Sequence, residues 1–334
     1  MQTSYFVLGF FVTVAAVSVY SAERGSGGTL LVANKGDHTI GFIDPETGKQ
    51  VAAVDVVGVT PHEVIASPDG RTVYAPIYGN SGVGKPGTDG TNLAVIDAAS
   101  HKVIGNVDFG HGVRPHCPMF GPKNGMLYVT TELDKSVSII DPKTLKIVGS
   151  VPTGQAESHM LAISHDGKRG YTANVGPGTV SVLDLEARKT IKVIPISGET
   201  QRISISPDDK LVFTSDQKKP QLAVIDTATN TVKTWVPLPG EGYGTASTPD
   251  GRWLVVACSK VNKVAVVDLK TMKVEHTIDV PRAPQESLVR PDGRVAYVSC
   301  DASHQIAAID TATWKVERLI EAGKTADGLA WASR

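Results

Sequence analysis

Short runs of alternating apolar and polar residues recur along the chain from about residue 29 onward. In the last complete unit they read "ESLVR", "VAYVS", "QIAAID" and "WKVERLIEA", separated by segments rich in Asp, Asn, Gly and Pro. Alternation with a period of two is typical of half-buried β-strands, and these turn residues close tight hairpins. Each unit therefore predicts four short antiparallel strands.

The unit repeats with a regular period. Its clearest landmark is a pair of apolar residues followed by Asp and a polar turn, as in "VIDAASHK" and "AIDTATWK". Successive landmarks are 42 to 44 residues apart, except for one spacing of 53. The landmark aspartates are Asp44, Asp97, Asp141, Asp184, Asp226, Asp268 and Asp310. Four strands in about 40 residues is the pattern of a propeller blade, so seven landmarks predict seven blades.

The two ends of the repeat complement each other. The first strands, "TLLVAN" and "TIGFID", have no inner strand before them, and the chain ends on "DGLAWAS", an inner strand without outer ones. Joining these segments in one blade would close the ring and leave no open sheet edge. We predict an all-β, seven-bladed β-propeller with four antiparallel strands per blade, forming a single domain over residues 29–334.

The N-terminal segment has a different pattern. Residues 1–22 carry no charged side chain, and an apolar run from Tyr5 to about Val19 is followed by the small residues Ser21 and Ala22. This pattern predicts a secretory signal peptide cleaved near Ala22, then a flexible lead-in over residues 23–28. An uncleaved anchor is the alternative, although the run is slightly short for a span of roughly 20 residues. We expect a periplasmic or secreted protein without a transmembrane span after cleavage.

Composition excludes several classes of function. The chain has 33 basic and 34 acidic side chains, and this balance disfavours nucleic acid as a partner. Its three cysteines are an odd number without zinc-site spacing, so we expect buried thiols. No G-x-S-x-G, H-E-x-x-H, C-x-x-C or dinucleotide-binding motif is present, which leaves serine-hydrolase and nicotinamide chemistry unsupported. A closed ring needs no partner to bury its edges, so we expect a monomer.

The repeat also resembles a known family. Segments such as "KLVFTSDQKKPQLAVIDTATNTVKTWV" and "RVAYVSCDASHQIAAIDTATWKVERLI" resemble the YVTN-type β-propeller repeat, and the resemblance covers residues 29–333. It implies the propeller fold. Because that family includes binding modules, cell-surface proteins and lactonase-like relatives, it implies no single function.

One position of the repeat lies where the predicted inner strand begins, on the face where the central channel opens. Function on a propeller is carried by such loops rather than by the blades. The residues at this position are His62, His116, His159, Gln201, Tyr243, Gln285 and Asp327. Three consecutive blades therefore present a histidine, and the other four present side chains that we expect to contact a ligand.

Three converging imidazoles would suit one divalent ion such as Zn, Cu or Mn, with His62, His116 and His159 as ligands. Neighbouring residues would supply the remaining chemistry of a metal-dependent hydrolase or lyase acting on lactones or uronates. The candidate general bases are Glu63 and Glu157, and the candidate anion-binding residues are Arg114 and Arg202.

A structural role explains the same histidines without a metal. Pro-His pairs recur in "TPHEV" and "RPHCP", and such a histidine can hydrogen-bond the neighbouring blade. On this hypothesis the protein is an exported binding module, without a cofactor, that holds a small ligand or an envelope protein at the channel mouth.

A single long insertion, "YGNSGVGKPGTDGT" at residues 78–91, falls between the second and third strands of its blade. It lacks the spacing of a phosphate-binding P-loop and is not followed by a helix pattern. Two interpretations stay open: a specificity loop beside the mouth, with Lys85 contacting the ligand, or a solvated loop.

Overall fold

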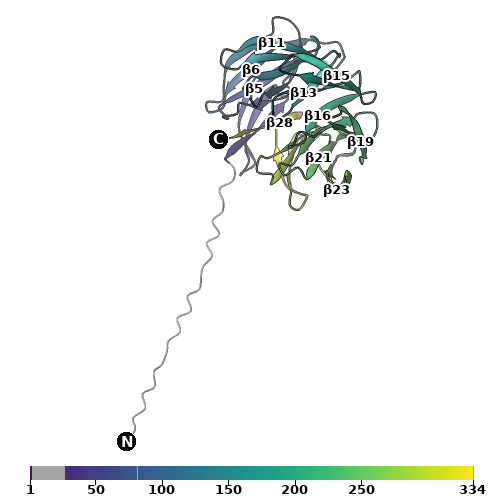
Figure 1. Cartoon of the computed structure of the whole chain (residues 1–334). Helices are drawn as coiled ribbons and strands as arrows, with labels where there is room; N and C mark the ends of the chain where they lie inside the picture. The colour runs from purple at the N-terminus through teal and green to yellow at the C-terminus, as the bar shows by residue number, and fades with distance from the viewer. Residues whose placement is uncertain (2–26, 81, 334) are drawn as a thin grey trace.

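The protein is a ring of seven four-stranded sheets (Figure 1). The computed structural model describes Met1, residues 27–80 and residues 82–333. The predicted signal peptide and most of the lead-in lie outside the described residues. Within residues 27–80 and 82–333, no helix is long and apolar enough to cross a membrane.

The strands follow the chain blade by blade. Blade 1 contains β28 (Ala326–Ser333), β1 (Gly28–Asn34), β2 (Thr39–Asp44) and β3 (Lys49–Asp55). Blade 2 contains β4 (Ile65–Ala66), β5 (Thr72–Gly79), β6 (Asp89–Asp97) and β7 (Lys102–Asp108). Blade 3 contains β8 (Pro115–Phe120), β9 (Leu127–Thr131), β10 (Ser136–Asp141) and β11 (Lys146–Pro152). Blade 4 contains β12 (Ser158–Ile163), β13 (Arg169–Asn174), β14 (Thr179–Asp184) and β15 (Lys189–Pro195).

The remaining blades have the same order from the inner to the outer strand. Blade 5 contains β16 (Thr200–Ile205), β17 (Leu211–Asp216), β18 (Gln221–Asp226) and β19 (Thr231–Pro237). Blade 6 contains β20 (Thr245–Ser247), β21 (Trp253–Cys258), β22 (Lys263–Asp268) and β23 (Lys273–Asp279). Blade 7 contains β24 (Pro284–Val289), β25 (Val295–Cys300), β26 (Gln305–Asp310) and β27 (Lys315–Glu321). Two short 3₁₀ turns, η1 (Ser259–Val261) and η2 (Asp301–Ser303), follow β21 and β25.

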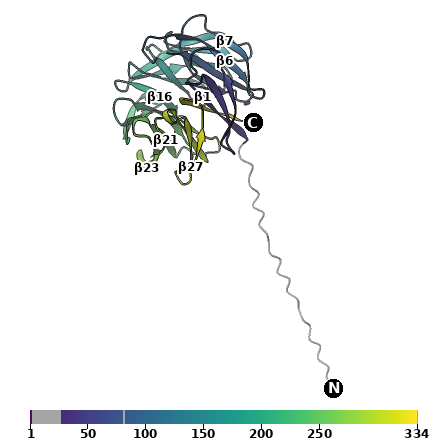
Figure 2. The ribbon, with the colours of Figure 1, turned by 180° about the vertical axis from the view of Figure 1, so that it is seen from behind.

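The ring closes as predicted. The C-terminal strand β28 pairs antiparallel with β1, with Leu30 opposite Trp331 and Leu31 opposite Ala330. Figures 1 and 2 show the two ends of the described chain meeting in this blade. The seven-bladed propeller with four antiparallel strands per blade is therefore confirmed.

Burial along the strands explains the sequence pattern. The two middle strands of a blade face neighbouring blades on both sides, so β2 is buried along almost its whole length. The outer strand β3 is mostly exposed, apart from Val54. The three cysteines, Cys117, Cys258 and Cys300, are buried free thiols, which confirms that expectation.

The landmark aspartates stabilise the turns at the face opposite the mouth. In the first turn, Oδ1 of Asp44 accepts a hydrogen bond of 2.9 Å from the Glu46 amide. The fourth residue after each aspartate has a positive φ, and in the first blade this residue is Gly48. In the other six blades it is His101, Leu145, Arg188, Asn230, Met272 and Trp314. Side chains of this set pack on the preceding blade: the ring of Trp314 lies 5.7 Å from that of Trp253.

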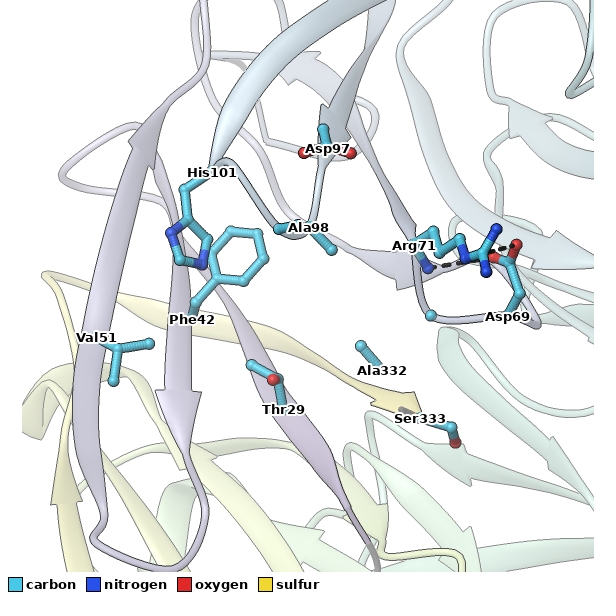
Figure 3. Close-up of a pocket in the computed structure, with 12 residues that line it drawn as sticks. Thr29, Phe42, Val51, Asp69, Arg71, Asp97, Ala98, His101, Ala332 and Ser333 are labelled. Atoms are coloured by element: carbon cyan, nitrogen blue, oxygen red, sulfur yellow. Dashed lines mark hydrogen bonds and ion pairs between the residues drawn. The ribbon is translucent and has the colours of Figure 1, made fainter.

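A cleft of about 690 Å³ lies at this opposite face, between blades 1 and 2 (Figure 3). It is bordered by Phe42 and Val51 of blade 1, by Arg71 and His101 of blade 2, and by Ser333 at the end of β28. The ring of His101 lies 4.7 Å from that of Phe42. Because His101 takes the position that Trp314 takes in blade 7, the smaller imidazole leaves part of the junction unfilled.

We expect the substitution His101→Trp to stabilise the protein by about 1 kcal/mol, because a larger ring would fill this cleft. The backbone accommodates it, since Trp314 has φ +54° at the equivalent position. The melting temperature should rise by roughly 2 °C, measured by differential scanning calorimetry. A lower melting temperature would show that the junction has no room for the indole.

Candidate functional site

Each of five inner strands carries a β-bulge at its mouth end. In β12, Ser158 pairs with Asn174 and Met160 with Ala173, so His159 is the extra residue. Similar register shifts occur in β8, β16, β24 and β28. A bulge redirects side chains at a strand end and is common beside functional sites. Here the bulges lie at the level where the channel opens.

The three predicted histidines come together at this level. The ring centroids of His62 and His116 are 5.3 Å apart, and those of His116 and His159 are 3.5 Å apart. His116 and His159 are fully buried, whereas the side chain of His62 is 20% exposed. Tyr78 packs against all three rings, at centroid distances between 4.7 and 5.7 Å. His62 is therefore the histidine of the cluster that solvent reaches.

The arrangement of the imidazoles is close-packed. The planes of His116 and His159 are inclined by 33°, and at a centroid distance of 3.5 Å the two rings are in direct contact. Among residues 27–80 and 82–333, no group of three His, Cys, Asp or Glu side chains is placed to hold a metal ion. The divalent site on three histidines stays a prediction that this arrangement does not support.

All three histidines are held in the neutral form. Burial lowers the pKa of His62 to about 3, although Asp327 acts in the opposite direction. Burial also lowers the pKa of His116, and the neighbouring His159 and His62 add to this effect. The pKa of His159 falls for the same reason, with Glu132 opposing the shift. Neutral imidazoles can each donate an electron pair.

Glu132, just after β9, connects this cluster to the mouth rim. Its Oε2 accepts a hydrogen bond of 2.6 Å from Tyr78 Oη and lies 3.4 Å from Nδ1 of His159. Its Oε1 accepts a hydrogen bond of 3.2 Å from Nη1 of Arg114. Burial opposes ionisation, yet His159, Tyr78 and Arg114 together lower the pKa of Glu132.

The insertion holds the Arg114 side chain in place through hydrogen bonds. Its Nε donates to Oδ1 of Asp89 at 2.6 Å, and its Nη2 donates to the carbonyl oxygen of Lys85 at 2.7 Å. Only 7% of the Arg114 side chain is exposed. The guanidinium predicted to bind an anionic substrate thus fastens the insertion to the mouth. Its predicted role as an anion-binding residue stays untested.

A cleft of about 350 Å³ lies between the insertion and blades 3 and 4. Lys85, Arg114, Glu132 and Glu157 border it, so it opens beside the histidine cluster. Glu157 accepts a hydrogen bond of 2.7 Å from the Gly176 amide, which turns its carboxylate toward blade 4. Of the two predicted general bases, Glu157 borders this cleft and Glu63 does not.

Glu63, the other predicted base, belongs to a buried cluster centred on Arg202. Nη1 of Arg202 donates to Glu63 and to Glu286, and Nη2 donates to Oδ1 of Asp327 at 2.8 Å. The exposed fraction of the Arg202 side chain is 3%. The ring of Tyr243 lies 5.3 Å from the guanidinium carbon. Arg202 thus balances buried carboxylates contributed by three other blades.

Lys35 completes this cluster. Its Nζ lies 3.1 Å from Asp327 and 3.0 Å from Asp301. Burial opposes ionisation of Asp327, but Lys35 and Arg202 outweigh it and hold its pKa at about 2. Burial raises the pKa of both Glu63 and Glu286, with Arg202 acting in the opposite direction. Four carboxyl groups therefore share two cationic partners.

The remaining predicted residues divide between this cluster and the rim. Tyr243 and Asp327 belong to the cluster, and burial raises the pKa of Tyr243 to about 12. Gln285 instead donates to Oγ of Ser259 at 3.1 Å, while the next residue, Glu286, reaches Arg202. Gln201 is half-buried beside Arg202 in β16. Two consecutive residues at the mouth end of β24 therefore have different surroundings.

Sequence reasoning missed Lys35, Tyr78 and Glu132. Lys35, Glu132 and Asp301 each precede a landmark aspartate by nine residues, at the mouth end of the second strand. That repeat position is polar or charged in most blades, with Val175 in blade 4 as the exception, so a second ring of site residues could have been found by the same alignment. Tyr78 lies at the start of the insertion, where the alignment is interrupted.

Comparison with known proteins places this chain in a family. The model of the cytochrome D1 heme domain family matches residues 87–202 and 125–332, which together span about three quarters of the chain. The chain belongs to the cytochrome D1 heme domain family. His116 and His159 lie inside the matched residues, and His62 lies before them. The propeller expected from the repeat is supported, whereas the YVTN-type assignment stays a prediction.

Two relatives extend the comparison. The chain is 28% identical over 127 residues to Protein NirF of Stutzerimonas stutzeri, a match that covers 38% of this chain and 30% of NirF. The chain therefore spans about a third of that relative's length. Kuenenia stuttgartiensis hydrazine synthase has a similar structure, with a TM-score of 0.73 and 21% identity over 86% of this chain and 93% of that one. This likeness concerns the fold.

Proposed function

We propose that this protein binds a heme-type tetrapyrrole at the mouth of the central channel. The observation that carries the proposal is the cluster of three neutral, closely packed imidazoles in a member of the cytochrome D1 heme domain family. Imidazole nitrogen is a usual axial ligand of heme iron. Such binding would give the chain a small-molecule ligand at the same mouth where the sequence predicted one.

The donor set fits this group. Nδ1 of His116 is buried and has no hydrogen-bond partner among the described residues. His62 would hold the iron, because its side chain reaches solvent, and Tyr78 would fix the orientation of its ring. When bound, heme supplies an iron centre for redox chemistry or for binding a further ligand. The cleft beside Lys85 gives the mouth additional space on one side.

We expect purified protein to bind ferric heme with one-to-one stoichiometry, seen as a shift of the Soret band during titration. His62→Ala should weaken binding by at least about tenfold, since it removes the accessible imidazole that would hold the iron. His101→Trp, which changes only the opposite face, is the matched control and should bind as the wild type does. No spectral change in the wild type, or equal affinity in His62→Ala, would contradict the proposal.

Elemental analysis separates this proposal from the hydrolase hypothesis. Stoichiometric Zn, Cu or Mn without tetrapyrrole absorbance would overturn heme binding and favour the divalent centre. The same preparation also tests export, because cell fractionation and N-terminal sequencing locate the protein and any cleavage near Ala22.

A further inference from the structure

Glu132 contacts the histidine cluster through a single carboxylate oxygen. Oε2 lies 3.4 Å from Nδ1 of His159 and accepts the hydrogen bond from Tyr78 at 2.6 Å. The Glu132 side chain is 1% exposed, and that of His159 is 2% exposed. The Glu132 carboxylate and the His159 imidazole are in direct contact, so each can influence the other without an intervening water.

We infer that Glu132 is a positioning residue that keeps His159 in the tautomer with its proton on Nδ1. A neutral imidazole carries one N–H, and an ionised carboxylate only accepts hydrogen bonds. The proton therefore belongs on the nitrogen that faces Glu132. The other nitrogen, Nε2, is left with its lone pair, as in histidines whose second nitrogen is oriented by a carboxylate.

The tautomer of His159 determines which hydrogen-bonding or metal-binding group the buried part of the mouth presents to a ligand. With the proton on Nδ1, His159 presents an electron-pair donor, whereas the other tautomer would present an N–H. The inference goes beyond heme binding, because it holds for any ligand that needs a donor nitrogen. A failure of the heme titration would leave it standing.

Arg114 and Tyr78 hold the Glu132 carboxylate in place. Arg114 donates to Oε1 at 3.2 Å, so the two oxygens have separate partners and the carboxylate cannot rotate freely. Arg114 also bonds Asp89 and the carbonyl of Lys85. The position of the insertion is thereby connected to the orientation of His159 through two side chains.

The test uses the ligand-free protein labelled with ¹⁵N. Long-range proton–nitrogen spectra distinguish the two imidazole tautomers, and loss of one spin system in His159→Gln assigns its signals. In the wild type, His159 should have its proton on Nδ1. In Glu132→Gln the ratio of the tautomers should fall by about tenfold or more, because the negative charge 3.4 Å from Nδ1 of His159 is removed.

Tyr78→Phe is the matched control. It removes the hydrogen bond from Tyr78 to Oε2 but leaves the carboxylate, so the proton of His159 should stay on Nδ1. A wild-type spectrum with the proton on Nε2 would overturn the inference without any variant. An unchanged tautomer in a folded Glu132→Gln protein would overturn it as well.

Discussion

Replacing Arg202 by methionine should lower the free energy of unfolding by about 3–5 kcal/mol. The substitution keeps much of the side-chain volume but leaves the carboxyl groups of Glu63 and Glu286 buried without their cation. Removing one partner of a buried ion pair is costly for this reason. Lys35 still neutralises Asp327, so the largest effect falls on the two glutamates. Urea unfolding at pH 7.5 measures the loss.

Arg169→Met is the matched control. Arg169 also pairs with one carboxylate, Asp184, at 3.0 Å, but 42% of its side chain is exposed. Exposed pairs contribute about 0–1 kcal/mol, so the control should lose little stability. Adding Glu63→Gln and Glu286→Gln to the Arg202 variant should recover part of the loss. Equal losses in the two arginine variants would mean that Arg202 does not balance buried charge.

Acidification should destabilise the protein through the histidine cluster. The folded state holds the pKa of all three histidines below the ordinary value of 6.5, whereas the unfolded chain takes up protons near that value. Each histidine costs no stability above about pH 6.5, and its cost grows as the pH falls toward the folded-state pKa, which is about 3 for His62. At pH 5.5 His62, whose folded-state pKa is about 3, should cost about 1.4 kcal/mol, and the lowered pKa values of His116 and His159 add to this loss.

The raised pKa of Glu63 and Glu286 opposes this trend, because a folded state that holds extra protons gains stability as the pH falls. A comparison of variants removes that contribution. In His116→Asn the loss of stability between pH 7.5 and 5.5 should be smaller than in the wild type, because the unfolded state no longer gains this proton. His38→Asn changes an exposed histidine, at φ +57° where Asn is tolerated, and should keep the wild-type dependence. Identical slopes in both variants would show that His116 is protonated equally in the two states.

The fold could be predicted almost completely from the sequence because a propeller repeats one local rule. Every blade needs the same alternation and the same aspartate turn, so seven copies of a weak signal give a strong one. The blade that β28 shares with β1, β2 and β3 was also predicted, because the first unit of the repeat lacks an inner strand and the last unit lacks the outer ones. The cleft at His101 could not be foreseen, because its size depends on how one side chain fills a junction.

The site was predictable only in part. The repeat placed His62, His116 and His159 around one opening, and the structure brings them together. The repeat did not reveal that Arg202 and Glu286, rather than Gln201 and Gln285, enter the charged cluster. A register shift of one residue between two strands cannot be recognised from the pattern of apolar residues in the sequence. The roles of Arg114 and Glu132 depend on contacts across blades, which no single repeat encodes.

The pairing of β28 with β1 has a consequence for biosynthesis. Lys35 is near the beginning of the repeat and Asp327 is near its end, yet they form one ion pair inside the channel mouth. A chain that is still being synthesised has Lys35 and Arg202 long before it has Asp327, so its mouth lacks one wall and one negative charge. Domains are made from the N-terminus onward. The charged cluster of the mouth is therefore completed only when β28 has been made and has paired with β1.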